Sequence, residues 1–371
     1  MGFLGKLSAH VRWRFTHLRN EWNHRRWMPG HLRGLEESYR NHSARIRDLL
    51  ATSPGCGVET IYLPEHIGDI VAAEPLVRRI KRTKPSSRIV WIVHPKFAEL
   101  LVANPDVDLV VPMFCVEEFN RLAADGLLGT IHFCKVEASG CWHCRNKPFI
   151  PAQAKSLNGS NYYKDRSLLQ AFCLGAGLPD LDEAPVLHLP EEARRSVDSL
   201  GLPARFACIH ALSNDPARNW TPQGWKRLAE DLIRETGLQV VEVGKDSVLV
   251  GTDVPYTDLC GRISLTSSIA VVEKATLFIG IDSGPAHFAN AAGISRIALL
   301  GRFLGYERYL PYSGGASWLS NLEAIQWPTP PADIPVEEVM RRVDSLLEKG
   351  FPRHGASASL SPSVPANQIR P

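Results

Sequence analysis

Apolar and polar positions follow the rhythm of an α/β protein from residue 58 onward. Short apolar runs rich in β-branched residues predict buried strands at residues 58–63, 88–93, 107–111 and 130–134. Apolar residues at three- and four-residue steps predict helices at residues 70–83, 96–103 and 162–175. Strands that alternate with helices in this way form a parallel sheet covered by helices.

The same alternation starts again near residue 205. Strands are predicted at residues 206–212, 238–244, 276–282 and 296–301, and helices at residues 222–236, 265–275, 285–292 and 336–349. We therefore expect an N-terminal Rossmann-like domain over residues 53–195 and a C-terminal one over residues 196–350. Two such domains facing each other across a cleft would suit a nucleotide-containing ligand, because each offers the carboxyl ends of its strands.

A basic arm over residues 1–52 precedes the first domain. Its first 50 residues carry ten Lys and Arg against four Asp and Glu, whereas residues 51–350 carry 30 against 35. Apolar residues up to Trp22 recur at helical steps, on one stripe of a helix that Pro29 and Gly30 would end. A second helical stripe runs from Leu35 to Leu50.

Two interpretations of the arm remain open. A basic amphipathic helix can bind an anionic surface such as the inner membrane, since its apolar face partitions while its cations meet lipid headgroups. Alternatively, the helix docks on the protein's own body or on a second subunit. Nucleic acid is not an expected partner, because neither a zinc-finger spacing nor an aromatic RNA-binding motif accompanies the basic residues.

Length and composition place the chain among globular proteins. Its 371 residues, 44% of them hydrophobic, are enough for two domains. No apolar run approaches the roughly 18 residues that span a bilayer, and no cleavable signal is evident at the start. We expect a cytoplasmic protein, either free or peripheral on the cytoplasmic face of the inner membrane. Residues 351–371, rich in Ser, Pro and Ala, are expected to be disordered.

The most informative stretch is TLFIGIDSGPAHFANAAG, residues 276–293. A strand ends in Asp282, Ser283 and Gly284, and a proline follows at a first-turn position of a helix. The free N–H groups and the dipole of that helix favour an anion, and His287 lies one turn further on. The alternative is that Asp282 or Ser283 only caps the helix and that His287 is a packed core residue.

A second polar cluster follows the first strand of the same domain. In the segment IHALSNDPARNWTPQGW, Ser213, Asn214 and Arg218 could contact a diphosphate. The guanidinium of Arg218 suits a phosphate because it can donate two parallel hydrogen bonds. A solvated surface arginine is the alternative.

A third cluster, LPEHIGDIVAAEPL, follows the first strand of the N-terminal domain. Asp69 lies at the turn from strand to helix, with His66 and Gly68 beside it on what we expect to be the acceptor side. A carboxylate there could remove a proton from a hydroxyl group, which is the work of a general base. The alternative for Asp69 is a helix cap.

Together these segments resemble glycosyltransferase family 9, the ADP-heptose:lipopolysaccharide heptosyltransferases, from about residue 58 to residue 301. The most specific motifs are DSGPAHFANAAG, followed by IALLG, and IGDIVAAEPL. The resemblance implies a GT-B fold and a metal-independent, inverting transfer of a sugar. It also implies that Asp69 is the base and that Ser283, Gly284 and His287 hold the diphosphate, with Asp282 beside them.

Two positions depart from the family pattern or are weakly defined. Arg218 stands where the family usually has a lysine, which keeps the charge but not the compact ammonium group. An acidic residue near the nucleotide ribose is often found after the following strand, and Asp246 is the nearest candidate. The resemblance also implies a nucleotide-sugar donor, ADP-heptose first, and a saccharide acceptor such as a lipopolysaccharide core.

Three cysteines lie outside that resemblance. Cys141 and Cys144 have the C-x2-C spacing of a metal site, and Cys134 or one of two nearby histidines, His132 and His143, could complete a tetrahedron around Zn or Fe. Free thiols or a redox-active pair are the alternative, because a second C-x2-C pair is missing. Any such metal would be structural, since the transfer requires no cofactor.

Other functions also remain open. The same fold can carry a different nucleotide-sugar reaction, such as an epimerisation. A non-catalytic protein that binds a nucleotide sugar, or that binds a partner through the cysteine loop, is a second alternative.

Overall fold

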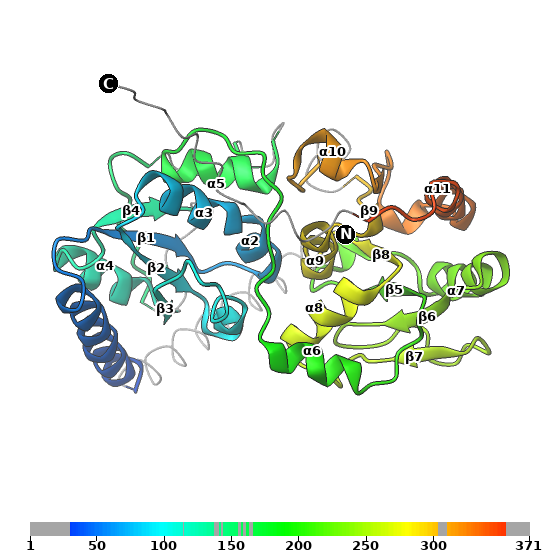
Figure 1. Cartoon of the computed structure of the whole chain (residues 1–371), viewed down its shortest axis with the longest axis horizontal. Coiled ribbons are helices and arrows are strands. Elements are labelled where there is room, and N and C mark those ends of the chain that lie inside the picture. The colour runs from blue at the N-terminus through cyan, green and yellow to red at the C-terminus, as the bar shows by residue number, and fades with distance from the viewer. Residues whose placement is uncertain are drawn as a thin grey trace, which may run out of the picture. The chain divides into compact units, whose positions relative to one another are not determined.

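The computed structural model describes residues 30–113, 115–136, 141, 144–154, 157–158, 161–162, 166–302 and 310–353. The chain forms two compact units, Met1–Leu181 and Asp182–Pro371. Each unit contains one parallel sheet with helices on its faces (Figure 1). The predicted α/β class with two Rossmann-like domains is confirmed.

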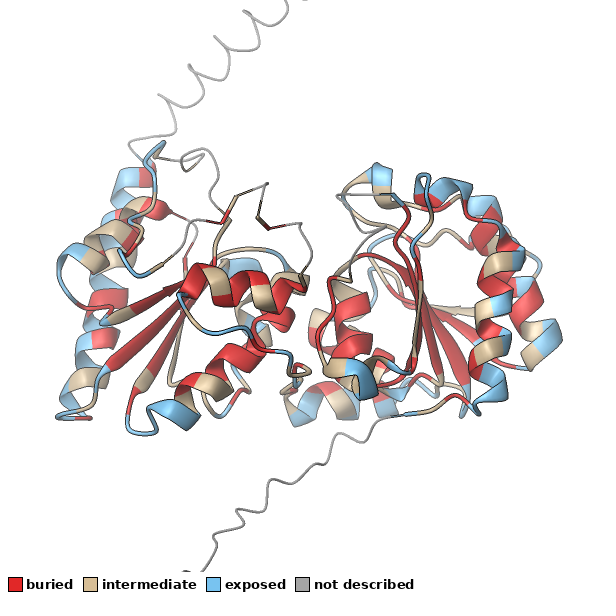
Figure 2. Cartoon of the chain, turned by 90° about the horizontal axis from the view of Figure 1, so that it is seen from above, coloured by how far each residue is buried: buried red, intermediate tan, exposed pale blue. Residues whose placement is uncertain are grey.

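The first unit is built on a sheet of strand order β3-β2-β1-β4. Its strands are β1 (Val58–Leu63), β2 (Arg88–Val93), β3 (Leu109–Pro112) and β4 (Thr130–Phe133). All neighbours are parallel, and Ile61 of β1 pairs with Trp91 on one side and with His132 on the other. Strands β1 and β2 are buried almost throughout because helices cover both faces of the sheet (Figure 2).

Alternate residues of these strands enter two separate cores. Ile61 and Trp91 pack on one face against helices α2 (Ile67–Ala72), α3 (Glu74–Thr83) and α5 (Leu168–Ala176). Tyr62 and Val90 point to the other face, where α4 (Val116–Ala124) and Ile46 from the helix over residues 30–51 cover them. The period of two along each strand thus divides the side chains between the two layers.

The helix over residues 30–51 belongs to the body of the first unit. Ile46 is fully buried, and His42 Nδ1 lies 2.6 Å from Glu118 Oε1 on α4. The second stripe of the arm is therefore confirmed as a helix, and that helix packs on the first unit. The first stripe, over residues 1–29, lies outside the described residues. Gly30, expected to end a helix, is itself helical.

The second unit contains a sheet of order β10-β9-β8-β5-β6-β7, parallel throughout. Its strands are β5 (Phe206–His210), β6 (Gln239–Glu242), β7 (Tyr256–Asp258), β8 (Leu277–Ile281), β9 (Ser295–Leu299) and β10 (Leu322–Ile325). The helices α7 (Pro222–Thr236) and α11 (Val336–Glu348) share a core with one face. Helices α6 (Glu191–Asp198), α8 (Leu265–Lys274) and α9 (Gly284–Ala292) pack in series, and a short α10 (Gly315–Leu319) precedes β10.

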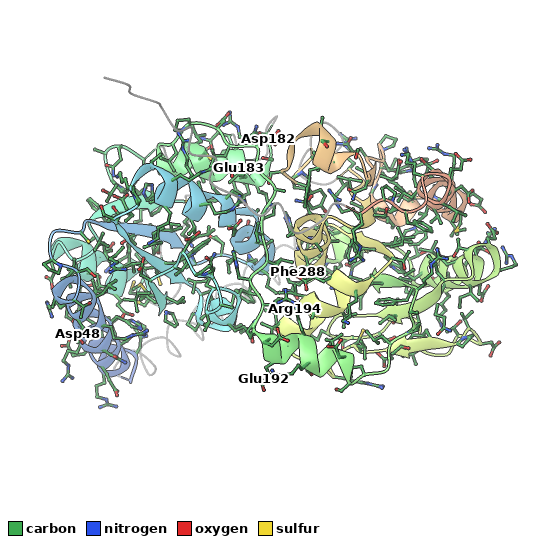
Figure 3. The ribbon with its side chains drawn as sticks, in the orientation of Figure 1. Asp48, Asp182, Glu183, Glu192, Arg194 and Phe288 are labelled. Atoms are coloured by element: carbon green, nitrogen blue, oxygen red, sulfur yellow. The ribbon has the colours of Figure 1, made fainter. Side chains whose placement is uncertain are left out.

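The two units divide between Leu181 and Asp182, whereas the sequence placed the domain boundary between residues 195 and 196. Helix α6 accounts for the difference because it is tied to α8 by two ion pairs. Arg194 (Figure 3) lies 3.4 Å from Glu273, and Asp198 lies 2.6 Å from Lys274. Helix α6, which the predicted boundary divides, is thus wholly part of the second unit.

Several predicted elements differ in detail from the observed ones. The helix expected over residues 70–83 is two helices, with a break at Ala73, because Pro75 has no N–H to donate to the carbonyl of Val71 and is accommodated in the first turn of a new helix. The helix expected over residues 96–103 is a 3-10 helix, Pro95–Leu100. The short strands β7 and β10 were not predicted, because both lie at sheet edges and neither is an apolar run.

Candidate functional site

The strand order of the second unit indicates where a ligand would bind, at the carboxyl ends of β5 and β8. From β5 the chain proceeds to β6 and β7 on one side, and β8, β9 and β10 lie on the other. The connections after β5 and β8 therefore leave adjacent strand ends in opposite directions. In open α/β sheets, ligands bind at the carboxyl ends of strands at such a switch point.

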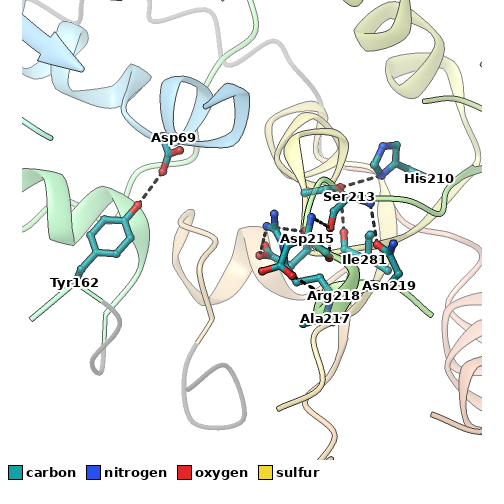
Figure 4. A network of polar contacts seen from close by, with 11 residues as sticks. Asp69, Tyr162, His210, Ser213, Asp215, Ala217, Arg218, Asn219 and Ile281 are labelled. Atoms are coloured by element: carbon teal, nitrogen blue, oxygen red, sulfur yellow. Dashed lines mark hydrogen bonds and ion pairs between the residues drawn. The ribbon is translucent and has the colours of Figure 1, made fainter. Parts of the chain in front are cut away.

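Ser283 lies at this point, at the start of α9. Its backbone is extended, and its hydroxyl makes no capping hydrogen bond to the helix. Instead the hydroxyl is hydrogen-bonded to His210 Nδ1 at 2.9 Å and donates to the carbonyl of Ile281 at 3.2 Å (Figure 4). The side chain of Ser283 thus does not satisfy the first N–H groups of α9, which favours a ligand-binding role over a cap.

His210 is a site residue that the sequence reasoning missed. It ends β5, and burial together with the charge of Arg218 lowers its pKa to about 4. The imidazole is therefore neutral near pH 7 and orients the hydroxyl of Ser283 without adding charge. A signal was available, since His210 lies near the carboxyl end of the predicted strand 206–212, and ligands bind at the carboxyl ends of strands in open α/β sheets.

Arg218 and Asp282 form an ion pair between the two connections. Arg218 Nη1 lies 3.4 Å from Asp282 Oδ2 and donates to the Asp282 carbonyl at 3.2 Å. The carboxylate is buried, whereas 27% of the Arg218 side chain remains exposed. The pair holds a cation beside the N-terminus of α9 with part of its surface open to a ligand.

Ser213 shapes the loop that carries Arg218. Its hydroxyl donates to the Asp215 carbonyl at 2.7 Å, and its N–H donates to Asn219 Oδ1 at 2.8 Å (Figure 4). These bonds lead into the 3-10 turn Pro216–Arg218. The structure therefore gives Ser213 a positioning role, while its contact with a ligand stays a prediction.

His287 and Asp246 stand apart from this network. The His287 ring is buried, its centroid lies 4.9 Å from that of Tyr312, and burial lowers its pKa to about 3. That environment is the packed alternative foreseen from the sequence. Asp246 is exposed after β6, where the buried Glu242 holds the loop by accepting from the Val248 N–H at 2.9 Å. Binding of donor by these two residues stays a prediction.

In the first unit the corresponding switch point lies between β1 and β4. Asp69 follows β1, in the first turn of α2, with Gly68 beside it in the same helix. Its Oδ2 accepts from the His66 N–H at 3.1 Å, and its Oδ1 accepts from the Tyr162 hydroxyl at 2.8 Å (Figure 4). Tyr162 lies in the connection after β4 and was not predicted to be a site residue.

The environment of Asp69 makes it a stronger base than an ordinary carboxylate. Burial and the negative charge of Glu65 raise its pKa to about 6, and the hydrogen bond from Tyr162 opposes that rise. Glu65 is paired with Lys135 at 3.2 Å, and the His66 side chain is largely exposed. A carboxylate with this pKa is ionised at neutral pH yet can accept a proton readily.

The cysteine cluster differs from the predicted one. The sulfur atoms of Cys141 and Cys144 lie within 4.8 Å of each other and of the Cys115 sulfur, a set that could hold a metal ion. Cys134 is not part of it, because that thiol is buried elsewhere and points to the carbonyls of His132 and Phe172. The residue that sequence spacing could not find is Cys115, at the start of α4.

Comparisons with known proteins agree with the geometry. The model of "Glycosyltransferase family 9 (heptosyltransferase)" matches residues 164–304. Lipopolysaccharide heptosyltransferase 3 of Escherichia coli is 20% identical over 285 residues, 63% of this chain and 80% of that protein. Its counterpart in strain K12 is 25% identical over 191 residues, 46% of this chain and 54% of that protein.

Solved structures resemble the fold over most of the chain. A glycosyltransferase family 9 protein from Veillonella parvula DSM 2008 gives a TM-score of 0.62 at 16% identity, covering 79% of this chain and 97% of that one. E. coli ADP-heptose lps heptosyltransferase II gives 0.56 at 16% identity, covering 79% and 99%. E. coli heptosyltransferase WaaC with ADP gives 0.52 at 14% identity, covering 77% and 99%.

The likeness to these solved structures shows a GT-B fold, and the family match over residues 164–304 indicates a glycosyltransferase. Within that class, the curated relatives and the family model support a glycosyltransferase family 9, heptosyltransferase-like protein. In the described part of the chain, no helix combines the length and the apolar character needed to cross a bilayer.

Proposed function

We propose that this protein is an inverting glycosyltransferase that moves a heptose, or a related sugar, from a nucleotide diphosphate donor to a saccharide acceptor. ADP-heptose is the donor and a lipopolysaccharide core is the acceptor in this proposal. The names of its relatives support both, since they include lipopolysaccharide heptosyltransferases and an ADP complex.

One observation carries the donor side of the proposal. The N-terminus of α9 has beside it an oriented hydroxyl, Ser283, and a partly exposed cation, Arg218. Both groups suit a diphosphate, because the helix dipole and the guanidinium favour negative charge and the hydroxyl can donate a hydrogen bond. As the sugar leaves, the same groups would stabilise the charge that builds on the departing diphosphate.

Asp69 supplies the base on the acceptor side. The acceptor O–H proton passes to the Asp69 carboxylate while the acceptor oxygen forms a bond to the anomeric carbon of the donor sugar. The bond from that carbon to the diphosphate oxygen breaks, and the nucleoside diphosphate leaves. Tyr162 keeps the carboxylate oriented, and the transfer proceeds through these protein groups without a bound metal.

The basic arm has a place in the same proposal. Residues 1–29 carry six Lys and Arg and one Glu. We assign them to the anionic cytoplasmic face of the inner membrane, which would hold the enzyme near a lipid-linked acceptor. The helix over residues 30–51 is excluded from that role because it is docked on the first unit.

The deciding experiment measures sugar transfer by the Asp69→Asn variant. Transfer from ADP-heptose to a heptose-acceptor saccharide is followed by mass spectrometry, and binding of ADP is followed by calorimetry. We expect donor binding close to wild type and transfer reduced by at least about 100-fold, the scale of a lost general base. Asp48→Asn, a change of an exposed carboxylate in the same unit (Figure 3), is the matched control and should retain full activity.

The outcomes separate the competing functions. An active Asp69→Asn enzyme would remove Asp69 from the chemistry. Incubation of donor without acceptor distinguishes an epimerase, because that reaction changes the configuration of the sugar with no acceptor present. A wild-type protein that binds ADP-heptose but neither transfers nor epimerises the sugar would be a binding protein.

A further inference from the structure

A histidine lies against the cysteine cluster of the first unit. The sulfur atoms of Cys115, Cys141 and Cys144 lie within 4.8 Å of one another. His31, on the helix over residues 30–51, has its Nε2 3.3 Å from the Cys115 sulfur, and its side chain is buried. Four side chains from three separate segments therefore converge at one point.

The distances match the edges of a metal-centred tetrahedron. Bond lengths of about 2.3 Å from zinc to sulfur and about 2.0 Å from zinc to nitrogen place neighbouring ligand atoms about 3.5 to 3.8 Å apart. The 3.3 Å from nitrogen to sulfur is close to such an edge, and the sulfur atoms need only small movements to reach it. Three cysteines and one histidine are a common ligand set of structural zinc sites.

Backbone hydrogen bonds link Cys141 to the two residues that follow Cys144. The Arg145 N–H donates to the Cys141 carbonyl at 2.7 Å, and the Cys141 N–H donates to the Asn146 carbonyl at 2.8 Å. Arg145 adopts a left-handed conformation with φ of 63°, which is uncommon for a residue other than glycine. The N–H groups of Asn146 and Glu117 are directed at the sulfur atoms of Cys144 and Cys115, each two residues earlier in the chain.

Electrostatics favours a cation at this point. Three sulfur atoms lie close together in one partly buried site, and several thiolates can share such a site only when a cation balances their charge. A divalent ion supplies that balance by binding the thiolates and releasing their protons. Sulfur ligands select soft or borderline metals such as zinc over magnesium or calcium.

We propose that His31 and the three cysteines bind one Zn²⁺ ion in a closed structural site. The ion would fasten the helix over residues 30–51, together with Cys141 and Cys144, to the start of α4. Neighbouring hydrogen bonds support this arrangement, since Asn146 donates to Glu117 at 2.6 Å and Asn120 donates to the Lys147 carbonyl at 3.0 Å. The proposal is independent of the sugar transfer.

Space for the ion to arrive is also present. A cavity of about 300 Å³ lies between the helix over residues 30–51 and the β3–α4 connection, with His31 and Cys115 in its wall. Glu118 lines the same cavity but is held by His42 and Ser38, so its carboxylate is directed to those partners.

The first test measures the metal content of the full-length protein. After growth with zinc, elemental analysis of the purified wild type should find one zinc per chain. Cys115→Ser, Cys141→Ser and Cys144→Ser should each weaken zinc binding at least about tenfold in competition with a chromogenic chelator. Cys56→Ser and Cys134→Ser are the matched controls in the same unit and should leave zinc binding unchanged.

Three results of that test would overturn the proposal. They are a wild type that neither contains nor takes up zinc, iron in place of zinc, and loss of the metal in Cys134→Ser but not in Cys115→Ser. A disulfide between the cysteines would also overturn it, and titration of free thiols in the metal-free protein detects that bond.

The second test addresses His31 through the spectrum of the Co²⁺-substituted protein. His31→Ala should weaken metal binding at least about tenfold and shift the visible ligand-field bands, because a nitrogen ligand is lost. His31→Cys should restore binding and raise the thiolate-to-cobalt absorption in the ratio of four thiolates to three. An unchanged spectrum in both variants would remove His31 from the site, and His31→Cys keeps the test valid if His31→Ala fails to fold.

Discussion

The hydroxyl of Tyr162 donates a hydrogen bond of 2.8 Å to Oδ1 of Asp69, across 93 residues of sequence. The bond favours the ionised carboxylate, whereas burial and Glu65 favour the protonated form. The balance leaves the pKa of Asp69 at about 6. Tyr162 thereby keeps the proposed base charged at neutral pH while its basicity stays above that of an ordinary aspartate.

The pH dependence of transfer should therefore show an acidic limb. If Asp69 acts as the base, kcat/KM should fall tenfold per pH unit below about pH 6, because the protonated carboxyl group cannot accept a proton. Initial rates between pH 4.5 and 8 test this expectation. A limb near pH 4 would mean that the base is an unperturbed carboxylate.

Tyr162→Phe should move that limb upward. The variant removes a hydrogen bond to the ionised carboxylate, which is worth about 1.5 kcal/mol and corresponds to a pKa rise of about one unit. The rate at pH 8 should be affected less than the rate at pH 6. Phe172→Leu, a change at a neighbouring core ring without a hydroxyl group, is the control for packing. A limb that stays in place would show that the hydroxyl does not tune Asp69.

Two variants of Arg218 test separately its charge and its pair of parallel hydrogen-bond donors. Arg218→Ala should weaken ADP binding by roughly tenfold or more, since hydrogen bonds to charged groups contribute about 1.5 to 3 kcal/mol. Arg218→Lys should retain part of the affinity, because the charge remains but the two parallel donors are lost. Arg234→Ala removes an exposed arginine of α7 and is the control. Equal calorimetric affinities in all three variants would contradict the assignment.

Variants of Ser283 and His287 test two further donor-binding predictions separately. Ser283→Ala should weaken ADP binding several-fold, because a preoriented hydroxyl is lost. His287→Ala should also weaken ADP binding if the family role applies, whereas a purely packed ring would lower the free energy of unfolding and leave affinity unchanged. Calorimetry and denaturant unfolding on the same preparations distinguish the two roles.

The low pKa of His210 predicts how the free energy of unfolding changes in mild acid. Its pKa is about 4 in the folded protein and about 6.5 when unfolded, so the unfolded state takes up the proton first as pH falls. The neutral histidine thus supports the fold above about pH 6.5, and that support is lost between about pH 6.5 and 4. The difference amounts to about 3 kcal/mol for this group. His210→Gln should lose less stability over this range, and an identical loss in both proteins would contradict the assignment.

The arm is best tested by a deletion that spares the docked helix. Removing residues 1–29 should abolish sedimentation with anionic vesicles, because six of the basic residues lie there. Neutral vesicles serve as the control. Removing residues 1–50 would also expose the core around Ile46, so that lost sedimentation could come from unfolding instead of from lost membrane binding. Undiminished sedimentation after the shorter deletion would assign the arm to another surface.

The central strands and long helices could be predicted because their signals are local. Residues 58–63 and 88–93 are apolar runs, and the helix from Pro222 to Thr236 has a helical stripe, a proline at its start and a glycine after its end. The edge strands β7 and β10 could not be predicted in this way, because their partly exposed side chains form no apolar run.

The sequence alone predicted which segments would carry the chemistry, because Asp69, Arg218 and Ser283 stand in motifs next to strand ends. Only the tertiary structure decided which distant side chains meet them. Tyr162 reaches Asp69, His210 reaches Ser283 across 73 residues, and His31 reaches Cys115 across 84. The physical reason is that strand periodicity specifies which face of a sheet a side chain joins, while the order in which parallel strands pair decides whose connections lie side by side.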